Sequence, residues 1–487
     1  MFKISLWQKV CFGLVTSGAM IISHIINNGL LKFYTDMIGM SGELYGIAWL
    51  FFAIYNTIND PIIGYVSDKR QYSLKKGKRR FYIRRAIPMI FLGLIIVTLV
   101  NPVWNAYFTL FILIIGLCVY DTGIATLALN IEALKNVITT DSNERASINM
   151  VMIYVNLIPG VLAGLIPYIL TNDYSVKMVR LLFVLFSLFG FLMSIIGGYF
   201  LKEPMFIYKE ELKKKAENEV DTNNNSEIKF SLKPFFSAFE SKSFRYFAIA
   251  NLIISIPISA YYGNIIYYFD DVMVVEDLIL FGFTLDANSM PFLVMGTVGL
   301  MMPAIYPLYY KLGKKIEHRK IVMAGLSVSA VCYIGLFFAD HFLIMTLLYL
   351  FIMFGIGTFW LFSTIILADS IDEYQLRTGK RKDGVFLGMN SIITTPAFSI
   401  MTYIFGKTLD FYGYDGTLSI QSPDALLGIR LGNGLIPAFF LIVGVIVFYF
   451  YPLKGDDLRN MKKEFRERFT ASNNKSNLIE DNRELGV

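Results

Sequence analysis

Long apolar segments alternate with short polar ones along most of the chain. Residues 87–100, 181–200 and 435–450 contain no charged side chain at all. A helix needs about 20 mostly apolar residues to cross a lipid bilayer. By that criterion the pattern predicts about twelve membrane-spanning helices, centred near residues 22, 56, 93, 117, 160, 190, 255, 300, 330, 356, 396 and 440.

The composition supports a membrane protein and disfavours other fold classes. Only 17% of the 487 residues are charged, against about 25% in a typical soluble protein. One soluble core cannot bury so many helices that are apolar on every side, and the strands of a membrane β-barrel would alternate in short segments. We therefore predict an all-α polytopic membrane protein, whose first apolar segment is a retained helix without a cleavage site typical of signal peptides.

Basic residues gather in alternate loops, which predicts the orientation in the membrane. Nine Lys or Arg residues lie between positions 69 and 85, and further groups lie at 311–320 and 377–382. The loops at 35–44 and 270–291 contain acidic residues and no Lys or Arg. Because short basic loops stay on the cytoplasmic side, we expect both termini to be cytoplasmic.

The polar stretches also divide the chain. Residues 202–243 are polar and Asn-rich, which predicts a cytoplasmic linker between six-helix bundles at 1–201 and 244–453, with a cytoplasmic tail at 454–487. The turns after the second and eighth predicted helices resemble each other, each being rich in Gly and basic residues. Two halves related by a repeat are typical of transporters, whose solute site lies near the middle of the membrane.

Acidic residues inside the apolar segments are the main candidates for function. Asp60 lies about two-thirds of the way along the second predicted helix, with Asn59 beside it and Asn56 one turn earlier. Asp121 lies at nearly the same depth in the fourth predicted helix. A carboxylate at such a depth costs several kcal/mol unless it is paired, protonated or bound to a cation. These four residues predict a site for a coupling cation or proton.

Three blocks carry a resemblance to a known family. Residues 34–69, which include N-D-P-x-x-G, residues 139–149 and residues 358–384, which include A-D-x-x-D-E-Y and T-G-x-R-x-x-G, resemble segments of the glycoside–pentoside–hexuronide:cation symporters. This is the family of the melibiose permease, within the major facilitator superfamily. The resemblance implies twelve helices in two six-helix bundles that alternate around a central cavity. It also implies cotransport of a sugar-like solute with Na⁺ or H⁺.

The resemblance assigns some residues and leaves others without a match. Asn59 and Asp60 fall at the family's cation-site positions, whereas Asn56 is an amide where the family often has an acid. Trp360 matches an aromatic residue that lines the sugar cavity. The permease's charged sugar-binding residues fall instead at positions near Met20, Ala128, Ile153 and Thr395. This departure disfavours galactoside transport, and we expect Asp121 to supply the missing acid of the cation site.

Polar and aromatic side chains within the predicted helices are candidates to bind the solute, because sugars are bound through hydrogen bonds and aromatic faces. The strongest candidates are Asn27, Tyr120, Tyr262 and Trp360. Further candidates are His24, Asn156, Asn264, Asn390 and Thr395.

Charged residues at the cytoplasmic ends of the second and tenth predicted helices suggest a gate. Charge pairs between the two halves would hold the inner side closed and separate when it opens. The candidates for this cytoplasmic gate are Asp68, Arg70, Asp369, Asp372, Glu373 and Arg377.

The sequence thus favours a secondary active transporter in the cell membrane, coupled to H⁺ or Na⁺, for a sugar or glycoside-like solute. One alternative keeps the fold and transports a lysolipid or another amphiphile, and another is a receptor that binds solute without moving it. No enzyme motif such as G-x-S-x-G, H-E-x-x-H or Walker A is present. We expect no cofactor besides the coupling ion, no metal and no binding of nucleic acid. The expected partners are the lipid bilayer and a small polar solute. We expect the protein to be a monomer.

Overall fold

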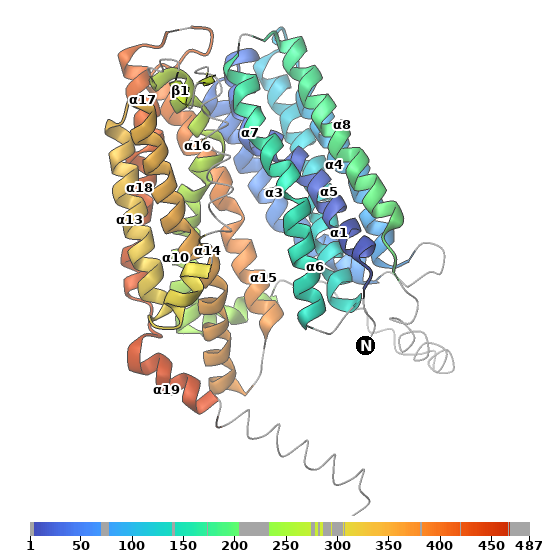
Figure 1. Cartoon of the computed structure of the whole chain (residues 1–487), viewed down its shortest axis with the longest axis vertical. Coiled ribbons are helices and arrows are strands. Elements are labelled where there is room, and N and C mark those ends of the chain that lie inside the picture. The colour runs from blue at the N-terminus through green and yellow to red at the C-terminus, as the bar shows by residue number, and fades with distance from the viewer. Residues whose placement is uncertain are drawn as a thin grey trace, which may run out of the picture.

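The structure is a computed structural model in which long helices run roughly side by side (Figure 1). Its description covers residues 4–69, 77–138, 142–172, 174–203, 233–273, 278–280, 283–285, 294, 305, 307–379, 382–418, 420–465 and 467.

The N-terminal part of the described chain is entirely helical. Its elements are α1 (Leu6–His24), the π-helix η1 (Ile25–Gly29), α2 (Leu30–Lys32), the π-helix η2 (Phe33–Met37), α3 (Gly42–Lys69), α4 (Arg79–Thr98), α5 (Ala106–Ile138), α6 (Ser142–Val155), α7 (Leu157–Thr171) and α8 (Val176–Phe200).

The C-terminal part begins within the predicted linker and is also mainly helical. Its elements are the 3-10 helix η4 (Lys233–Glu240), α10 (Lys242–Gly263), α11 (Ile265–Tyr267), the π-helix η5 (Tyr268–Val272), α13 (His318–Phe338), α14 (Phe342–Thr378), α15 (Asp383–Thr394), α16 (Pro396–Phe411), α17 (Pro423–Asn433), α18 (Leu435–Tyr449) and α19 (Gly455–Phe465).

The predicted all-α membrane fold is confirmed. Ten helices among the described residues are long and apolar enough to cross a membrane. Helix α3 is not one of the ten, although its 28 residues form the second predicted span. The predicted span near residue 300 lies almost wholly outside the described residues. The count of twelve is therefore consistent with the structure.

One short hairpin departs from the prediction of a plain loop at residues 270–291. Strands β1 (Leu278–Leu280) and β2 (Phe283–Leu285) pair antiparallel, with Leu278 opposite Leu285. Apolar and β-branched residues suit such a strand pair, but three residues per strand are too few for the sequence pattern to reveal.

Small residues let the helices of each half pack closely. Gly18 of α1 and Gly190 of α8 are so close that a Cβ on either would lie within 2.6 Å of the other's carbonyl oxygen. Gly325 and Gly355 bring α13 and α14 together in the same way. Membrane helices associate through such small-residue contacts because lipid supplies no hydrophobic driving force for their association.

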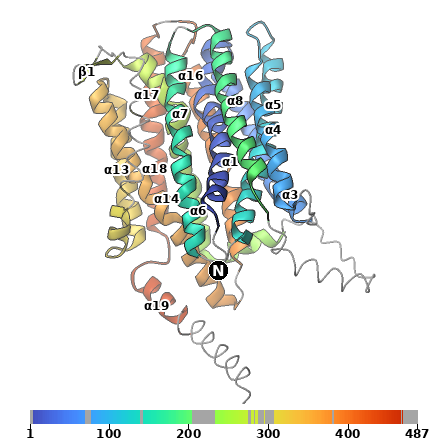
Figure 2. The same cartoon turned by 45° about the vertical axis from the view of Figure 1, so that its right-hand side comes forward.

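In both views α13 and α18 stand at one edge of the molecule, away from α4 and α5 (Figure 2).

One hydrogen bond between helices is repeated at equivalent positions of the two halves. Ser17 of α1 donates to Asn156 at the break between α6 and α7, over 2.6 Å. Asn251 of α10 donates to Asn390 of α15, over 2.8 Å. Asn251 follows Ser17 by 234 residues, and Asn390 follows Asn156 by the same number. This agreement supports the internal repeat predicted from the sequence.

The two halves touch where α3 meets α16. A Cβ on Gly406 would lie 2.1 Å from the carbonyl oxygen of Gly42, so no side chain fits there. We expect Gly406→Ala to lower the stability by about 1–3 kcal/mol through overpacking. Thermal unfolding of the purified protein measures this, with Gly64→Ala as the control. Gly64 lies on α3 with open space around its Cβ position, so equal melting temperatures for the two variants would contradict the expectation.

Candidate functional site

A polar cluster joins α3 and α5 inside the membrane-spanning region. Asn59 donates from Nδ2 to Oδ2 of Asp121 over 3.0 Å, and both side chains are buried. A few residues away, the hydroxyl groups of Tyr55 and Thr122 are 2.6 Å apart. Two hydrogen bonds therefore fix these helices against each other at the depth predicted from the sequence.

Asp60 lies beside this pair and completes an acidic centre. Its side chain is partly buried, and it follows Asn59 directly on α3, the helix that packs against α5. Among the ion pairs of the described residues, none involves Asp60 or Asp121. A carboxylate in this position must gain a proton or a cation to be stable. The centre can therefore take up a monovalent cation or a proton.

The acidic centre connects to helix α1. Tyr120, the residue before Asp121, donates from its hydroxyl group to Ser23 over 2.7 Å. Just beyond Ser23 lie His24, the last residue of α1, and Asn27 in η1, both partly buried. The hydrogen bond from Tyr120 therefore joins α5 to α1 next to the residues where solute binding is predicted.

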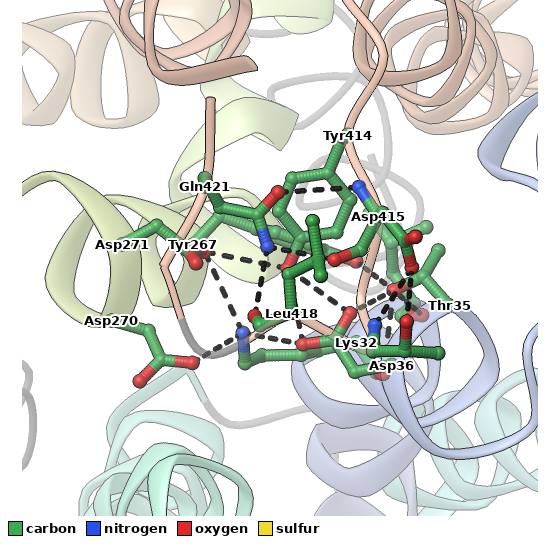
Figure 3. A network of polar contacts seen from close by, with 12 residues as sticks. Lys32, Thr35, Asp36, Tyr267, Asp270, Asp271, Tyr414, Asp415, Leu418 and Gln421 are labelled. Carbon is green, nitrogen blue, oxygen red and sulfur yellow. Dashed lines mark hydrogen bonds and ion pairs between the residues drawn. The ribbon is translucent and has the colours of Figure 1, made fainter. Parts of the chain in front are cut away.

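A second cluster, the Lys32 network, lies at one end of the molecule and was not predicted (Figure 3). The Nζ atom of Lys32 is 2.6 Å from Asp36, 2.5 Å from Asp270 and 3.8 Å from Asp271. It also lies 4.8 Å from the centre of the Tyr267 ring. Only 2% of the Lys32 side chain is exposed. One buried cation thus links the end of the first span to the end of the seventh.

The loop between α16 and α17 closes over the Lys32 network. The Tyr414 hydroxyl group donates to Asp36 over 3.1 Å and lies 3.4 Å from Asp271. Burial and these two carboxylates raise the pKa of Tyr414 above its usual value, so the phenol keeps its proton and remains a donor. Thr35 and Tyr267 add a hydroxyl–hydroxyl contact of 2.7 Å.

A further contact between the halves lies at the start of α3. Both oxygens of the Asp410 carboxylate accept backbone N–H groups, Gly42 over 2.9 Å and Glu43 over 2.7 Å. A carboxylate at a helix N-terminus satisfies unpaired donors and interacts favourably with the helix dipole. Here the cap comes from α16, so it also fastens the C-terminal half to the N-terminal half.

Comparison with known proteins places this architecture in a family. Residues 11–455 match the model of the family described as MFS/sugar transport protein. The chain belongs to this family. The match confirms the resemblance seen in the motifs, at the level of the sugar-transport proteins of the major facilitator superfamily. The chain is therefore a multi-pass membrane transporter of the sugar type.

Individual members of the family and superfamily align over nearly the whole chain. The chain is 25% identical to the "Uncharacterized symporter YnaJ" of Bacillus subtilis, over 96% of each protein. It is 24% identical to the "Putative sulfoquinovose importer" of Escherichia coli, over 96% of this chain and 95% of that protein. The crystal structure of a D-xylose–proton symporter superposes with a TM-score of 0.61 at 12% identity, over 92% and 96% of the two chains. At that identity the superposition shows the fold alone.

Three residues predicted to line the cavity form hydrogen bonds within the protein, two of them between helices and one within its own helix. Asn156 and Asn390 accept the hydrogen bonds from Ser17 and Asn251 described above. Thr395 donates to the Ser391 carbonyl oxygen over 2.8 Å. Polar residues in membrane helices commonly serve such contacts, which residue type alone does not distinguish from solute binding.

The remaining predicted cavity residues differ in their surroundings. Trp360 on α14 is 38% exposed, and Asn264 between α10 and α11 is buried. The side chain of Tyr262 lies outside the described residues. Asn56, which was predicted for the cation site and not for the cavity, is partly buried on α3.

The predicted cytoplasmic gate residues on α14 bind within the C-terminal half. Asp369 forms a 2.9 Å ion pair with Lys462 of α19. Glu373 accepts a hydrogen bond from Ser241 over 2.9 Å. Arg377 donates to a backbone oxygen, that of Glu240, and Asp372 lies on the same helix. The side chain of Asp68 and all of Arg70 lie outside the described residues, so the gate remains a prediction.

Proposed function

We propose that this protein is a cation-coupled symporter that carries a sugar or glycoside across the cell membrane by alternating access. The observation that carries the proposal is the acidic centre, in which Asp60 and Asp121 meet inside the membrane without a basic partner among the described ion pairs. The names of relatives point the same way, since they include symporters and a sulfoquinovose importer. The resemblance of the motifs to those of the glycoside–pentoside–hexuronide:cation symporters also supports the proposal.

We assign the Lys32 network to the extracellular side, because the basic loops predict that the opposite end is cytoplasmic. At the Lys32 end the halves are joined by ion pairs, by Tyr414 and by the Asp410 cap. At the other end, the partners of Asp369, Glu373 and Arg377 among the described residues belong to their own half. This pattern supports a state that is closed outside and accessible from inside.

Coupling follows from the charge of the acidic centre. An empty centre carries buried negative charge, which disfavours conformations that exclude water from it. Binding of H⁺ or Na⁺ neutralises the centre and allows closure around the solute. An ion can drive the transition only if it binds one of the two conformations more tightly than the other. With two carboxylates and the amides Asn56 and Asn59, we favour H⁺ as the coupling ion.

Uptake into proteoliposomes tests the proposed function. The wild-type protein is reconstituted and offered D-xylose, D-glucose and methyl β-D-glucoside under an imposed H⁺ or Na⁺ gradient. We expect one gradient to drive accumulation above the external concentration, and the matching ionophore to abolish it. Equilibration without accumulation under either gradient would contradict coupling.

A further inference from the structure

Two buried amides, one in each half, have side-chain atoms without a hydrogen-bond partner. Neither the oxygen nor the nitrogen of the Asn28 side chain is paired, and the Asn264 side-chain nitrogen is unpaired as well. Asn28 is 1% exposed and Asn264 is 3% exposed. Most buried polar groups in proteins are hydrogen-bonded, because an unpaired one costs free energy. Two such amides therefore need an explanation.

The amides lie in corresponding regions of the two halves, although not at matching positions of the repeat. Asn264 follows Asn28 by 236 residues, two more than the spacing of 234 that relates the repeated hydrogen bond. Asn28 lies in the π-helix η1, and Asn264 lies at the break between α10 and α11. Breaks in transmembrane helices are typical of binding sites in transporters built from repeats. π-Helical turns are also frequent at functional sites.

The contacts of their neighbours orient both amides toward the interface between the halves. Lys32 lies four residues after Asn28, and Tyr267 lies three residues after Asn264. Residues at these spacings share a helix face, and Lys32 and Tyr267 face each other (Figure 3). Helix α10 also packs directly against η1. The amides thus lie about 6 Å deeper in the membrane than the Lys32 network, on the side toward the acidic centre.

The charges around the amides select the class of ligand. No Lys or Arg occurs in the long segments 10–31, 33–68, 106–134, 146–176, 246–310, 342–376 and 383–406, and all of these except 10–31 contain acidic residues. The nearest cation, Lys32, is already surrounded by three carboxylates. An anionic sugar would therefore meet the negative acidic centre without a free cation to offset its charge. Hydroxyl groups, which both donate and accept, suit amides.

We propose that Asn28 and Asn264 form one subsite that binds hydroxyl groups of an uncharged sugar beneath the closed Lys32 network. This inference rests on the proposed function and narrows it, because it predicts that sugars with a sulfonate or carboxylate are poor substrates. Each half contributes one amide, so the subsite is complete only when the extracellular ends of the halves are together. Sugar binding would then favour the closed arrangement, as alternating access requires.

The test uses Asn28→Ala, Asn264→Ala and the double variant. The readout is the KM for the neutral sugar that the wild type accumulates best among D-xylose, D-glucose and methyl β-D-glucoside. We expect each single variant to raise the KM about tenfold, as loss of a hydrogen bond to a buried partner would. The melting temperature of the sugar-free protein should not fall, since the amides are unpaired there. Glucuronate and sulfoquinovose should be taken up at least tenfold less efficiently than the neutral sugar.

Asn433→Ala is the matched control, because Asn433 is a buried amide that donates to the Ile429 carbonyl oxygen over 3.1 Å. It should lower the melting temperature and leave the KM unchanged. The subsite would be overturned if the double variant kept the wild-type KM, whether or not its melting temperature fell. Equal uptake of the anionic sugars would overturn the substrate class.

A binding measurement without any gradient separates this inference from the proposed function. The three neutral sugars are added to the detergent-purified protein and the rise in melting temperature is recorded. If a sugar stabilises the wild type but not the double variant while no gradient drives uptake, coupling fails and the subsite stands. If uptake is gradient-driven and the double variant binds and transports normally, the subsite fails and coupling stands. If no sugar binds or moves, both are overturned.

Discussion

Asp121→Asn is expected to abolish gradient-driven accumulation of solute, lowering it at least about tenfold to the level of empty liposomes. The amide keeps the size of the side chain, and its oxygen can still accept the hydrogen bond from Asn59. It cannot bind a proton or balance the charge of a cation. Ion binding then no longer biases the two conformations, and the gradient loses its effect on the solute.

Exchange of solute across the membrane distinguishes lost coupling from a damaged protein. Counterflow, which needs no net ion movement, should survive in Asp121→Asn and in Asp60→Asn. Asp424→Asn, an exposed carboxylate in the first turn of α17, should behave as wild type. Accumulation that persists in Asp121→Asn but not in Asp60→Asn would assign coupling to Asp60 alone. Accumulation that persists in both would refute the acidic centre as the coupling site.

The sequence predicted the parts of this site that depend on local order. Helices two and four start from the same side of the membrane, so counting residues at 1.5 Å each places Asp60 and Asp121 at one depth. Hydropathy supplied the spans, and the intramembrane carboxylates stood out because they are costly there. In the structure Asn59 contacts Asp121. Counting residues gave only their depth, so the contact also required that the two helices be neighbours.

The Lys32 network could not be predicted, because it depends on how the halves meet. Lys32, Asp270 and Tyr414 lie far apart in the sequence, and each alone resembles an ordinary residue near the end of a span. A lone lysine close to an acidic loop was the available signal. Asn156 and Asn390 show the opposite difficulty, since their residue type suggested solute binding while their contacts join helices within each half.

The Lys32 network nevertheless explains why this end of the molecule is closed. Three carboxylates, of which Asp36 and Asp271 are partly buried and Asp270 is exposed, surround one buried lysine, so the lysine offsets part of a larger negative charge. Removing one partner of such a network leaves the other charges uncompensated. When water enters, the ion pairs become exposed and contribute little to the free energy of closure, so the two halves can separate. A gate that must reopen in each transport cycle requires this dependence on burial.

Lys32→Met is accordingly expected to destabilise the closed arrangement, by less than the about 3–5 kcal/mol typical of a fully buried pair, because it leaves the partly buried Asp36 and Asp271 and the exposed Asp270 without their cation. Its melting temperature should fall, and adding Asp270→Asn and Asp271→Asn should recover part of the loss. A second measurement uses Thr35→Cys in a background that lacks the three native cysteines. This cysteine should react far faster with a membrane-impermeant thiol reagent added from outside when Lys32→Met is also present. Lys407→Met is the control, since its ion pair with Glu43 is exposed and should have little effect. Unchanged stability and unchanged labelling in Lys32→Met would show that the apolar and Asp410 contacts alone hold this end closed.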